Sequence, residues 1–143
     1  MFQFPMTFTA SLAATRGSAA HWTACSEGFE LRCAVPVQFH GPGGGLSPED
    51  LFAQALLNCF TATFLVMAEK SSLSFERLNV EGSLTVDRDD SRRPVMKEFK
   101  FHIHLAACDA TERATVLVRK AMESGFILNS VRTALTYELH FEA

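Results

Sequence analysis

The stretch from residue 41 to residue 60, "GPGGGLSPEDLFAQALLNCF", joins a glycine-rich loop to the start of a long apolar segment. Ser47 has a side-chain oxygen that can cap the free amides of a helix, and Pro48 fits the first helical position. Glu49 and Asp50 follow, and their charges suit the positive end of the helix dipole. This stretch therefore predicts a helix that begins at about residue 47 and ends at about residue 71.

The predicted helix is unusually apolar, because residues 51–68 contain no charged side chain. That length is near the threshold for a membrane span. However, the polar residues Gln54, Asn58, Thr61 and Thr63 interrupt the run, and no basic cluster flanks it. A buried helix of a soluble protein is the better interpretation, and we expect no membrane association. Because the helix is apolar on nearly every side, it needs cover on more than one face.

Shorter segments with strand or helix patterns lie on both sides of this helix. The expected strands are residues 7–14, 21–26, 29–36, 76–87, 95–106 and 132–142. A turn is expected at Glu27 and Gly28, and a second helix should begin at a capping Asp109 and end at Gly125. This order of elements predicts an α+β fold with an antiparallel sheet. One six-stranded sheet would cover a single face of the long helix, so we expect a second subunit to cover the rest.

The composition is that of one soluble domain over residues 1–143. The net charge is −3 and the basic residues are scattered, which argues against a nucleic-acid surface. No Lys-Ser or Lys-Thr pair follows the glycine-rich loop, so a nucleotide-phosphate site is not indicated. Thirteen phenylalanines accompany one tyrosine and one tryptophan, which indicates a large core or one shared between subunits.

Four cysteines occur, at positions 25, 33, 59 and 108, without any paired metal-binding spacing. His102 and His104 have only the two-residue spacing of one strand face. We therefore expect no metal and no cofactor. The first charged residue is Arg16, so the chain does not begin like a secretory signal. A cytoplasmic protein with reduced thiols is expected.

Cys59 lies well inside the long helix, where a cysteine is most simply a small hydrophobic residue. Thiolates are favoured at helix N-termini, and Cys59 is ten residues after Glu49. A reactive Cys59 would therefore need a cation supplied from elsewhere in the protein.

The stretch 41–60 resembles the OsmC/Ohr family, in which a glycine-rich loop and a Pro-Glu-x-Leu-Phe-Ala helix start precede an x-Cys-Phe. The order of elements is similar to that family's fold across the chain. The resemblance implies the thiol-dependent reduction of organic hydroperoxides, with Cys59 as the reactive cysteine. It also implies that Arg16, in "ATRGS", stabilises the thiolate and orients the peroxide, and that Glu49 holds Arg16 by a bidentate salt bridge.

One part of the family pattern is missing. Typical hydroperoxide reductases of the family resolve the oxidised cysteine with a second cysteine, in a Cys-Pro segment that precedes an arginine. Counting back from Arg132 in "SGFILNSVR" places Gly125 and Phe126 at these two positions. Cys108 lies outside this motif, and His40 in the glycine-rich loop is more simply a solvated histidine than a pocket residue.

Three interpretations remain open. The first is a one-cysteine peroxidase that is recycled by an external thiol. The second is an OsmC-like binding or structural protein without turnover. In the third, Cys33 or Cys25 of a neighbouring subunit resolves the oxidised Cys59.

The spacing of the implied catalytic residues predicts how subunits contribute to the site. Glu49 and Cys59 are about 15 Å apart along the helix, so an arginine held by Glu49 serves the Cys59 of its own chain poorly. Two such helices packed antiparallel would bring the start of one near the middle of the other. We therefore expect an obligate, intertwined homodimer in which Cys59 of one chain meets Arg16 and Glu49 of its partner.

Overall fold

The structure is a computed structural model that describes residues 2–143, and its chain divides into two compact units. The first unit extends to Leu51 and the second begins at Phe52. The expectation of a single domain over residues 1–143 stays a prediction.

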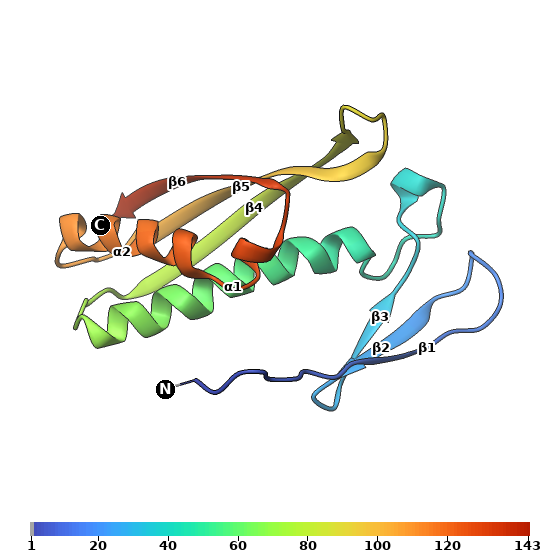
Figure 1. Cartoon of the computed structure of the whole chain (residues 1–143), viewed down its shortest axis with the longest axis horizontal. Helices are drawn as coiled ribbons and strands as arrows, with labels where there is room; N and C mark the ends of the chain where they lie inside the picture. The colour runs from blue at the N-terminus through green and yellow to red at the C-terminus, as the bar shows by residue number, and fades with distance from the viewer. Residues whose placement is uncertain (1) are drawn as a thin grey trace. The chain divides into compact units, whose positions relative to one another are not determined.

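The first unit contains a three-stranded antiparallel sheet in the order β1-β2-β3 (Figure 1). Its strands are β1 (Ser11–Ala13), β2 (Trp22–Ser26) and β3 (Phe29–Cys33), followed by the short 3-10 helix η1 (Val37–Phe39). Glu27 and Gly28 both have positive φ, 53° and 77°. Positive φ at both positions is what a two-residue hairpin turn of type I′ requires, so the predicted turn is confirmed.

The glycine-rich loop after η1 returns to β3. Leu46 donates its amide to the Arg32 carbonyl at 2.9 Å, and its own carbonyl accepts the Ala34 amide at 3.0 Å. A side chain on Gly45 would place its Cβ 2.9 Å from the carbonyl carbon of Cys33. Glycine at position 45 therefore permits the close approach of the loop to the strand.

The long helix α1 covers Pro48–Lys70, as the sequence predicts to within one residue at its end. The Asp50 amide donates to the Ser47 hydroxyl oxygen at 3.0 Å, and the Ser47 amide donates to the Asp50 carboxylate at 2.9 Å. This reciprocal pair is a capping box with aspartate in the third position. The predicted helix start is therefore confirmed at the level of individual hydrogen bonds.

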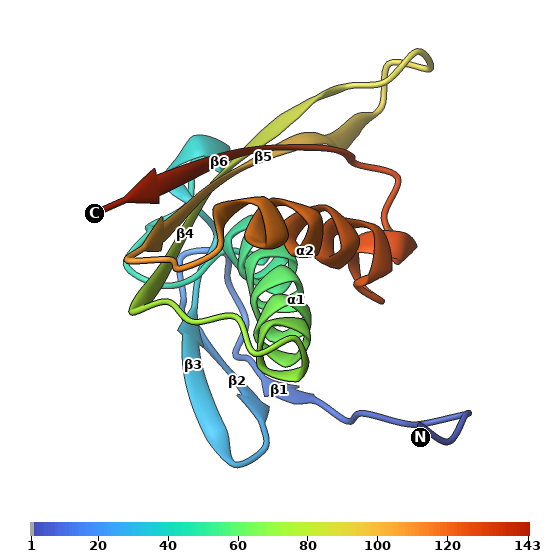
Figure 2. The same cartoon turned by 90° about the vertical axis from the view of Figure 1, so that its left-hand side faces the viewer.

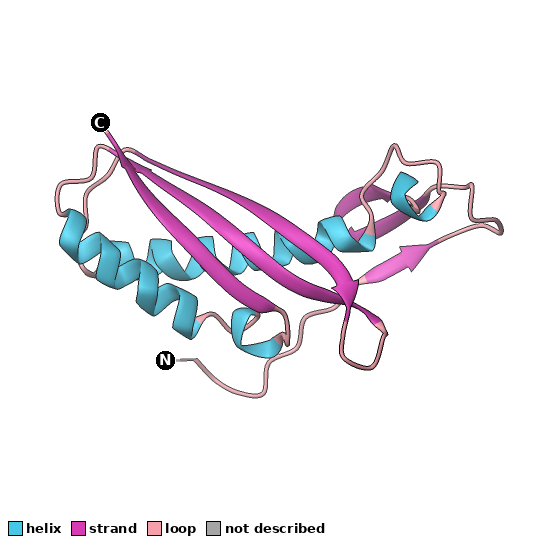
Figure 3. Ribbon diagram, turned by 90° about the horizontal axis from the view of Figure 1, so that it is seen from above, coloured by secondary structure: helices cyan, strands magenta, loops and turns pink. Residues whose placement is uncertain are grey.

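The second unit is a three-stranded sheet with helices on one face (Figure 2). Its elements after α1 are β4 (Arg77–Arg88), β5 (Pro94–Ala106), α2 (Thr111–Ser124), the 3-10 helix η2 (Leu128–Ser130) and β6 (Ala134–Glu142). The core between helices and sheet is formed mainly by Leu56, Phe60, Phe64, Phe99, Phe101, Ile103, Leu105, Ala114, Val118 and Ala121. Seen from above, the strands lie in front of the helices, so this face of the sheet has no helix over it (Figure 3).

The α+β class is confirmed, but the sheets differ in two respects from the antiparallel sheet that was expected. β6 pairs with β5 in parallel, with His102 opposite Glu138, whereas β4 and β5 are antiparallel. The reason is the connection from Ala106 to Ala134, which carries α2 across the sheet and returns the chain in the same direction. The described chain also forms two three-stranded sheets rather than one of six strands.

The prediction that Asp109 caps the N-terminus of α2 is wrong. The helix begins at Thr111, and its N-cap residue Ala110 has no side-chain capping bond. Asp109 instead accepts a hydrogen bond from the Ser74 amide at 3.2 Å. Its carboxylate therefore joins two loops of the second unit rather than closing the first turn of a helix.

By length and composition, α1 is apolar enough to cross a membrane. Its stripe of Leu56, Phe60 and Phe64 is fully buried in the core of the second unit. On another side of the helix, Leu65 and Val66 are 46% and 49% exposed. A single chain thus leaves part of the apolar surface of α1 uncovered.

Candidate functional site

Cys59 lies in the middle of α1 and is half-buried against the core of the second unit. Its thiol is free, and its backbone carbonyl accepts a bond from the Thr63 hydroxyl at 2.8 Å. The helix therefore holds Cys59 against the core of the second unit, and the residue as a whole is only partly buried.

Gly125, at the end of α2, lies next to this sulfur. A Cβ added to Gly125 would lie 2.8 Å from the Cys59 sulfur and 3.0 Å from the Leu128 side chain. Gly125 has φ −64° and ψ 130°, an extended conformation that any residue adopts. The sequence suggested that Gly125 ends the helix in a left-handed conformation, but its backbone is extended. Glycine suits position 125 because a side chain there would have no space. The position that the family resemblance assigns to a resolving cysteine is thus in contact with Cys59.

Cys108 lies beyond the opposite end of α2 from Gly125. A helix of this length separates the two positions by about 20 Å, and Gly125 adjoins the Cys59 sulfur. Disulfides need Cα atoms within about 7 Å of each other. A disulfide between Cys59 and Cys108 of the same chain would therefore require a large rearrangement.

The other two cysteines belong to the first unit. Cys33 at the end of β3 is only 1% exposed, and its sulfur lies 3.7 Å from the Leu31 carbonyl oxygen. Cys25 in β2 is half-buried and lies opposite Glu30 in the register of β3. Both thiols are free, and the burial of Cys33 within its own chain limits its access to a reagent.

The two remaining residues of the predicted site lie near the start of α1 and after β1. Glu49 is partly buried, and its Oε1 is a buried oxygen without a hydrogen-bond partner in the described chain. Arg16 is exposed in the turn after β1. Within residues 2–143, no ion pair joins Arg16 to Glu49. A buried carboxylate oxygen without a donor is costly, so Glu49 would be stabilised by a hydrogen bond from the arginine that the sequence assigns to it.

A groove of about 690 Å³ lies in the second unit between the β4–β5 loop and the segment before β6. Phe52, Lys97 and Arg132 are among its lining residues, and Cys59 is not. Phe52 lies two helical turns, about 10 Å, before Cys59 along α1. The groove and the sulfur are therefore separate features of the single chain.

The open face of the second unit's sheet carries a polar cluster that the sequence pattern did not reveal. His102 on β5 lies 3.4 Å from a carboxylate oxygen of Glu138 on β6, and His140 lies 3.5 Å from the same oxygen. Lys100 donates to the other Glu138 oxygen at 2.8 Å. This hydrogen bond and the charge of Lys100 lower the pKa of the Glu138 carboxyl, with smaller contributions from His102 and His140. Only the alternation in "HIH" and "ELH" could have suggested the cluster, and only if the pairing of the two strands were known.

The family is decided by a match over most of the chain. The family model described as "OsmC-like protein" matches residues 41–140, which include the glycine-rich loop, α1 and the sheet of the second unit. The chain belongs to the OsmC-like protein family. A curated relative, an uncharacterized protein of Acinetobacter baylyi, is 30% identical over 118 residues, covering 80% of this chain and 78% of that protein.

Solved structures confirm the OsmC-like fold. An OsmC-like protein of unknown function from Vibrio cholerae has a TM-score of 0.82 at 17% identity, covering 94% of this chain and 99% of its own. An organic hydroperoxide resistance protein OsmC from Legionella pneumophila has a TM-score of 0.70 at 22% identity, with coverage of 99% and 100%. OhrB, the organic hydroperoxide resistance protein of Bacillus subtilis, has a TM-score of 0.67 at 22% identity, with coverage of 94% and 98%. In this OsmC-like chain, α1 is the core helix of the fold.

Proposed function

We propose that this OsmC-like protein is a cytoplasmic, thiol-dependent peroxidase that reduces organic hydroperoxides through Cys59 alone. The observation that carries the proposal is the free Cys59 sulfur in contact with Gly125, the position at which the family resemblance places the second cysteine. The family membership and the structural likeness to hydroperoxide resistance proteins support the reaction class. The absence of a thiol at position 125 supports recycling by an external thiol.

The proposed reaction begins at the Cys59 thiolate, which attacks the distal oxygen of the hydroperoxide. An S–O bond forms, the O–O bond breaks, and the departing alkoxide takes a proton to become an alcohol. The cysteine is now a sulfenic acid. An external thiol attacks its sulfur and releases water, which leaves a mixed disulfide. A second external thiol then frees Cys59, so that one hydroperoxide and two thiols become an alcohol, water and a disulfide.

In the proposed homodimer, Cys59 of one chain forms a site with Arg16 and Glu49, which both belong to the other chain. The buried Glu49 oxygen without a donor supports the arrival of a guanidinium there, since arginine binds a carboxylate with two parallel hydrogen bonds. The exposed Leu65 and Val66 on α1 support a second copy as cover for the helix. In this site Arg16 would favour the thiolate and orient the peroxide.

The competing function is an OsmC-like binding or structural protein that does not turn over. Gly125 favours it, because an oxidised Cys59 has no neighbouring thiol to resolve it. Resolution by Cys33 of another subunit is less well supported, because Cys33 is 1% exposed in its own chain.

Trapping of the oxidised cysteine tests the proposal directly. We expect that one equivalent of cumene hydroperoxide, added with a sulfenic-acid trap such as dimedone, will label Cys59 before any other thiol. Peptide mass spectrometry without reduction should find no peptide that joins Cys59 to another cysteine of its chain, because Gly125 next to the Cys59 sulfur carries no thiol. First oxidation at Cys25, Cys33 or Cys108 would reject the assignment, and an unreactive Cys59 would favour the binding protein.

Mixing of two inactive variants tests the shared site. We expect a Cys59→Ser chain and an Arg16→Ala chain to be inactive alone and to regain activity after subunit exchange. In a mixed dimer, Cys59 of one chain meets Arg16 of the other, so one of two sites works. A random mixture should then recover about a quarter of the wild-type activity. Confirmed heterodimers that stay inactive, or an active monomer, would contradict the shared site.

A further inference from the structure

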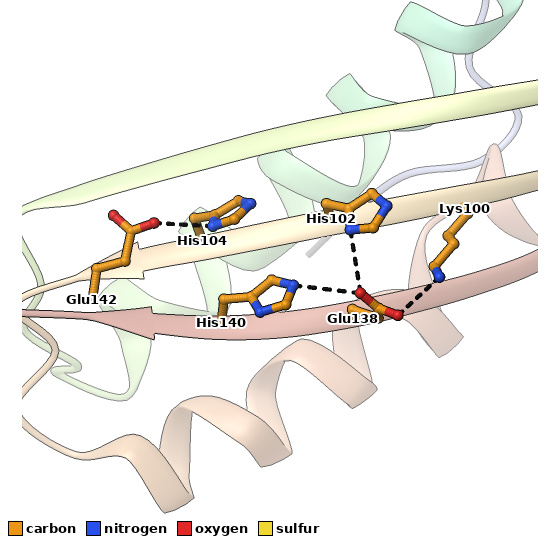
Figure 4. Close-up of polar contacts among 6 residues, drawn as sticks. All are labelled: Lys100, His102, His104, Glu138, His140 and Glu142. Carbon is orange, nitrogen blue, oxygen red and sulfur yellow. Dashed lines mark hydrogen bonds and ion pairs between the residues drawn. The ribbon is translucent and has the colours of Figure 1, made fainter.

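The open face of the β4-β5-β6 sheet gathers three histidines and two glutamates from two strands (Figure 4). In the parallel register, His102 of β5 faces Glu138 of β6, and His104 faces His140. The alternate residues of β5, including Phe101 and Ile103, are fully buried in the core. The cluster is therefore on the side of the sheet away from α1 and α2, and the core fixes the backbone on which it stands.

The candidate ligand atoms of three members lie close together. His102, Glu138 and His140 each offer one nitrogen or carboxylate oxygen, and these atoms all lie within 4.8 Å of one another. In a tetrahedral zinc site with bonds of about 2.1 Å, neighbouring ligand atoms are about 3.4 Å apart. The His102 Nδ1 and His140 Nε2 atoms lie 3.4 Å and 3.5 Å from one Glu138 oxygen. Two of the three distances between ligand atoms thus already match those of a tetrahedral site.

We propose that His102, Glu138 and His140 form a zinc-binding site on the open face of the sheet, separate from Cys59. Two imidazoles and one carboxylate are a ligand set that suits zinc, and solvent would take the fourth position. The site lies wholly within the second unit, and it rests neither on the proposed peroxidase activity nor on a dimer.

The neighbours of the three ligands support this role. Lys100 binds one Glu138 oxygen at 2.8 Å and leaves the other facing the two imidazoles. The ring of His104 stacks on that of His140, with centroids 4.8 Å apart, and the Glu142 carboxylate holds His104 Nδ1 at 3.0 Å. These contacts limit the rotation of the Glu138 carboxylate and of the His140 ring. A bound ion would also cross-link the edge strand β6 to β5, because its ligands come from both strands.

Zinc titration of the full-length, chelator-treated protein tests the site. Competition with a fluorescent zinc chelator at pH 7.5 should show one zinc ion per chain. His140→Ala and Glu138→Gln should each weaken binding at least about tenfold, since each removes one of three ligands. Binding should also weaken in acid, because a protonated imidazole does not bind metal.

Two variants serve as matched controls. His40→Asn removes a histidine outside the cluster, and asparagine tolerates the positive φ of 62° at that position. Cys59→Ser removes a thiol that could itself bind zinc. Both should keep the wild-type affinity within about twofold, because neither residue belongs to the cluster.

A thermal measurement provides a second readout. Zinc should raise the Tm of the wild type and of His40→Asn, but not that of His140→Ala, because an ion that binds only the folded state stabilises it. The cluster lies on the open face, so its variants leave the core intact, and circular dichroism can check that they fold. The proposal is overturned if the wild type binds no zinc, if His140→Ala and Glu138→Gln bind it unchanged, or if Cys59→Ser alone abolishes binding.

Discussion

Cys59→Ser is expected to abolish the reduction of organic hydroperoxides, lowering the rate by about 10³-fold or more, as the loss of a nucleophile does in other enzymes. A serine hydroxyl is not ionised at neutral pH and cannot be oxidised to a sulfenic acid, so both halves of the proposed reaction are lost. The measurement is the consumption of cumene hydroperoxide with an excess of a small thiol or dithiol.

The other cysteines of the chain supply matched controls. Cys25→Ser and Cys108→Ser change half-buried thiols like Cys59, and both variants should keep the wild-type rate within about twofold. Thermal unfolding of all three variants separates a chemical defect from a loss of fold. A fully active Cys59→Ser protein, or an equal loss of activity in Cys108→Ser, would remove the assignment of Cys59 as the nucleophile.

Gly125→Cys is expected to convert the protein into one that forms a disulfide with Cys59 in the same chain. In a disulfide, the Cβ of one cysteine lies about 3 Å from the sulfur of the other, which follows from an S–S bond of about 2.0 Å. A Cβ at position 125 would lie 2.8 Å from the Cys59 sulfur, so the backbone already has nearly the required geometry. After one equivalent of hydroperoxide, a non-reducing peptide map should show this disulfide in nearly every folded chain.

Gly125→Ala is the matched control for this substitution. It adds the same Cβ, crowded against Cys59 and Leu128, without a thiol. We expect it to lower the free energy of unfolding by about 1–3 kcal/mol, as overpacking does, and to form no disulfide. If a folded Gly125→Cys variant is oxidised at Cys59 yet forms no disulfide, the predicted contact between these positions is wrong.

The start of α1 and the hairpin turn at Glu27 and Gly28 could be predicted from the sequence because their causes are local. The capping bonds of α1 join Ser47 to Asp50 within one turn of chain, so the residue types alone indicate them. The same local stretch carried the motif by which Cys59 and Glu49 were assigned to the OsmC-like pattern. Alternation likewise predicted β4 and β5, since one face of each strand must be apolar to pack on the helices.

The features that the sequence left undecided depend on contacts between distant parts of the chain. Alternation looks the same in parallel and antiparallel strands, so the direction of β6 was decided by the path of α2 across the sheet. Asp109 has the residue type of a helix cap, but the Ser74 amide competes for its carboxylate. The contact of Gly125 with Cys59 and that of His140 with His102 join separate elements. Residue types allow many such pairings, and only the packed core selects one of them.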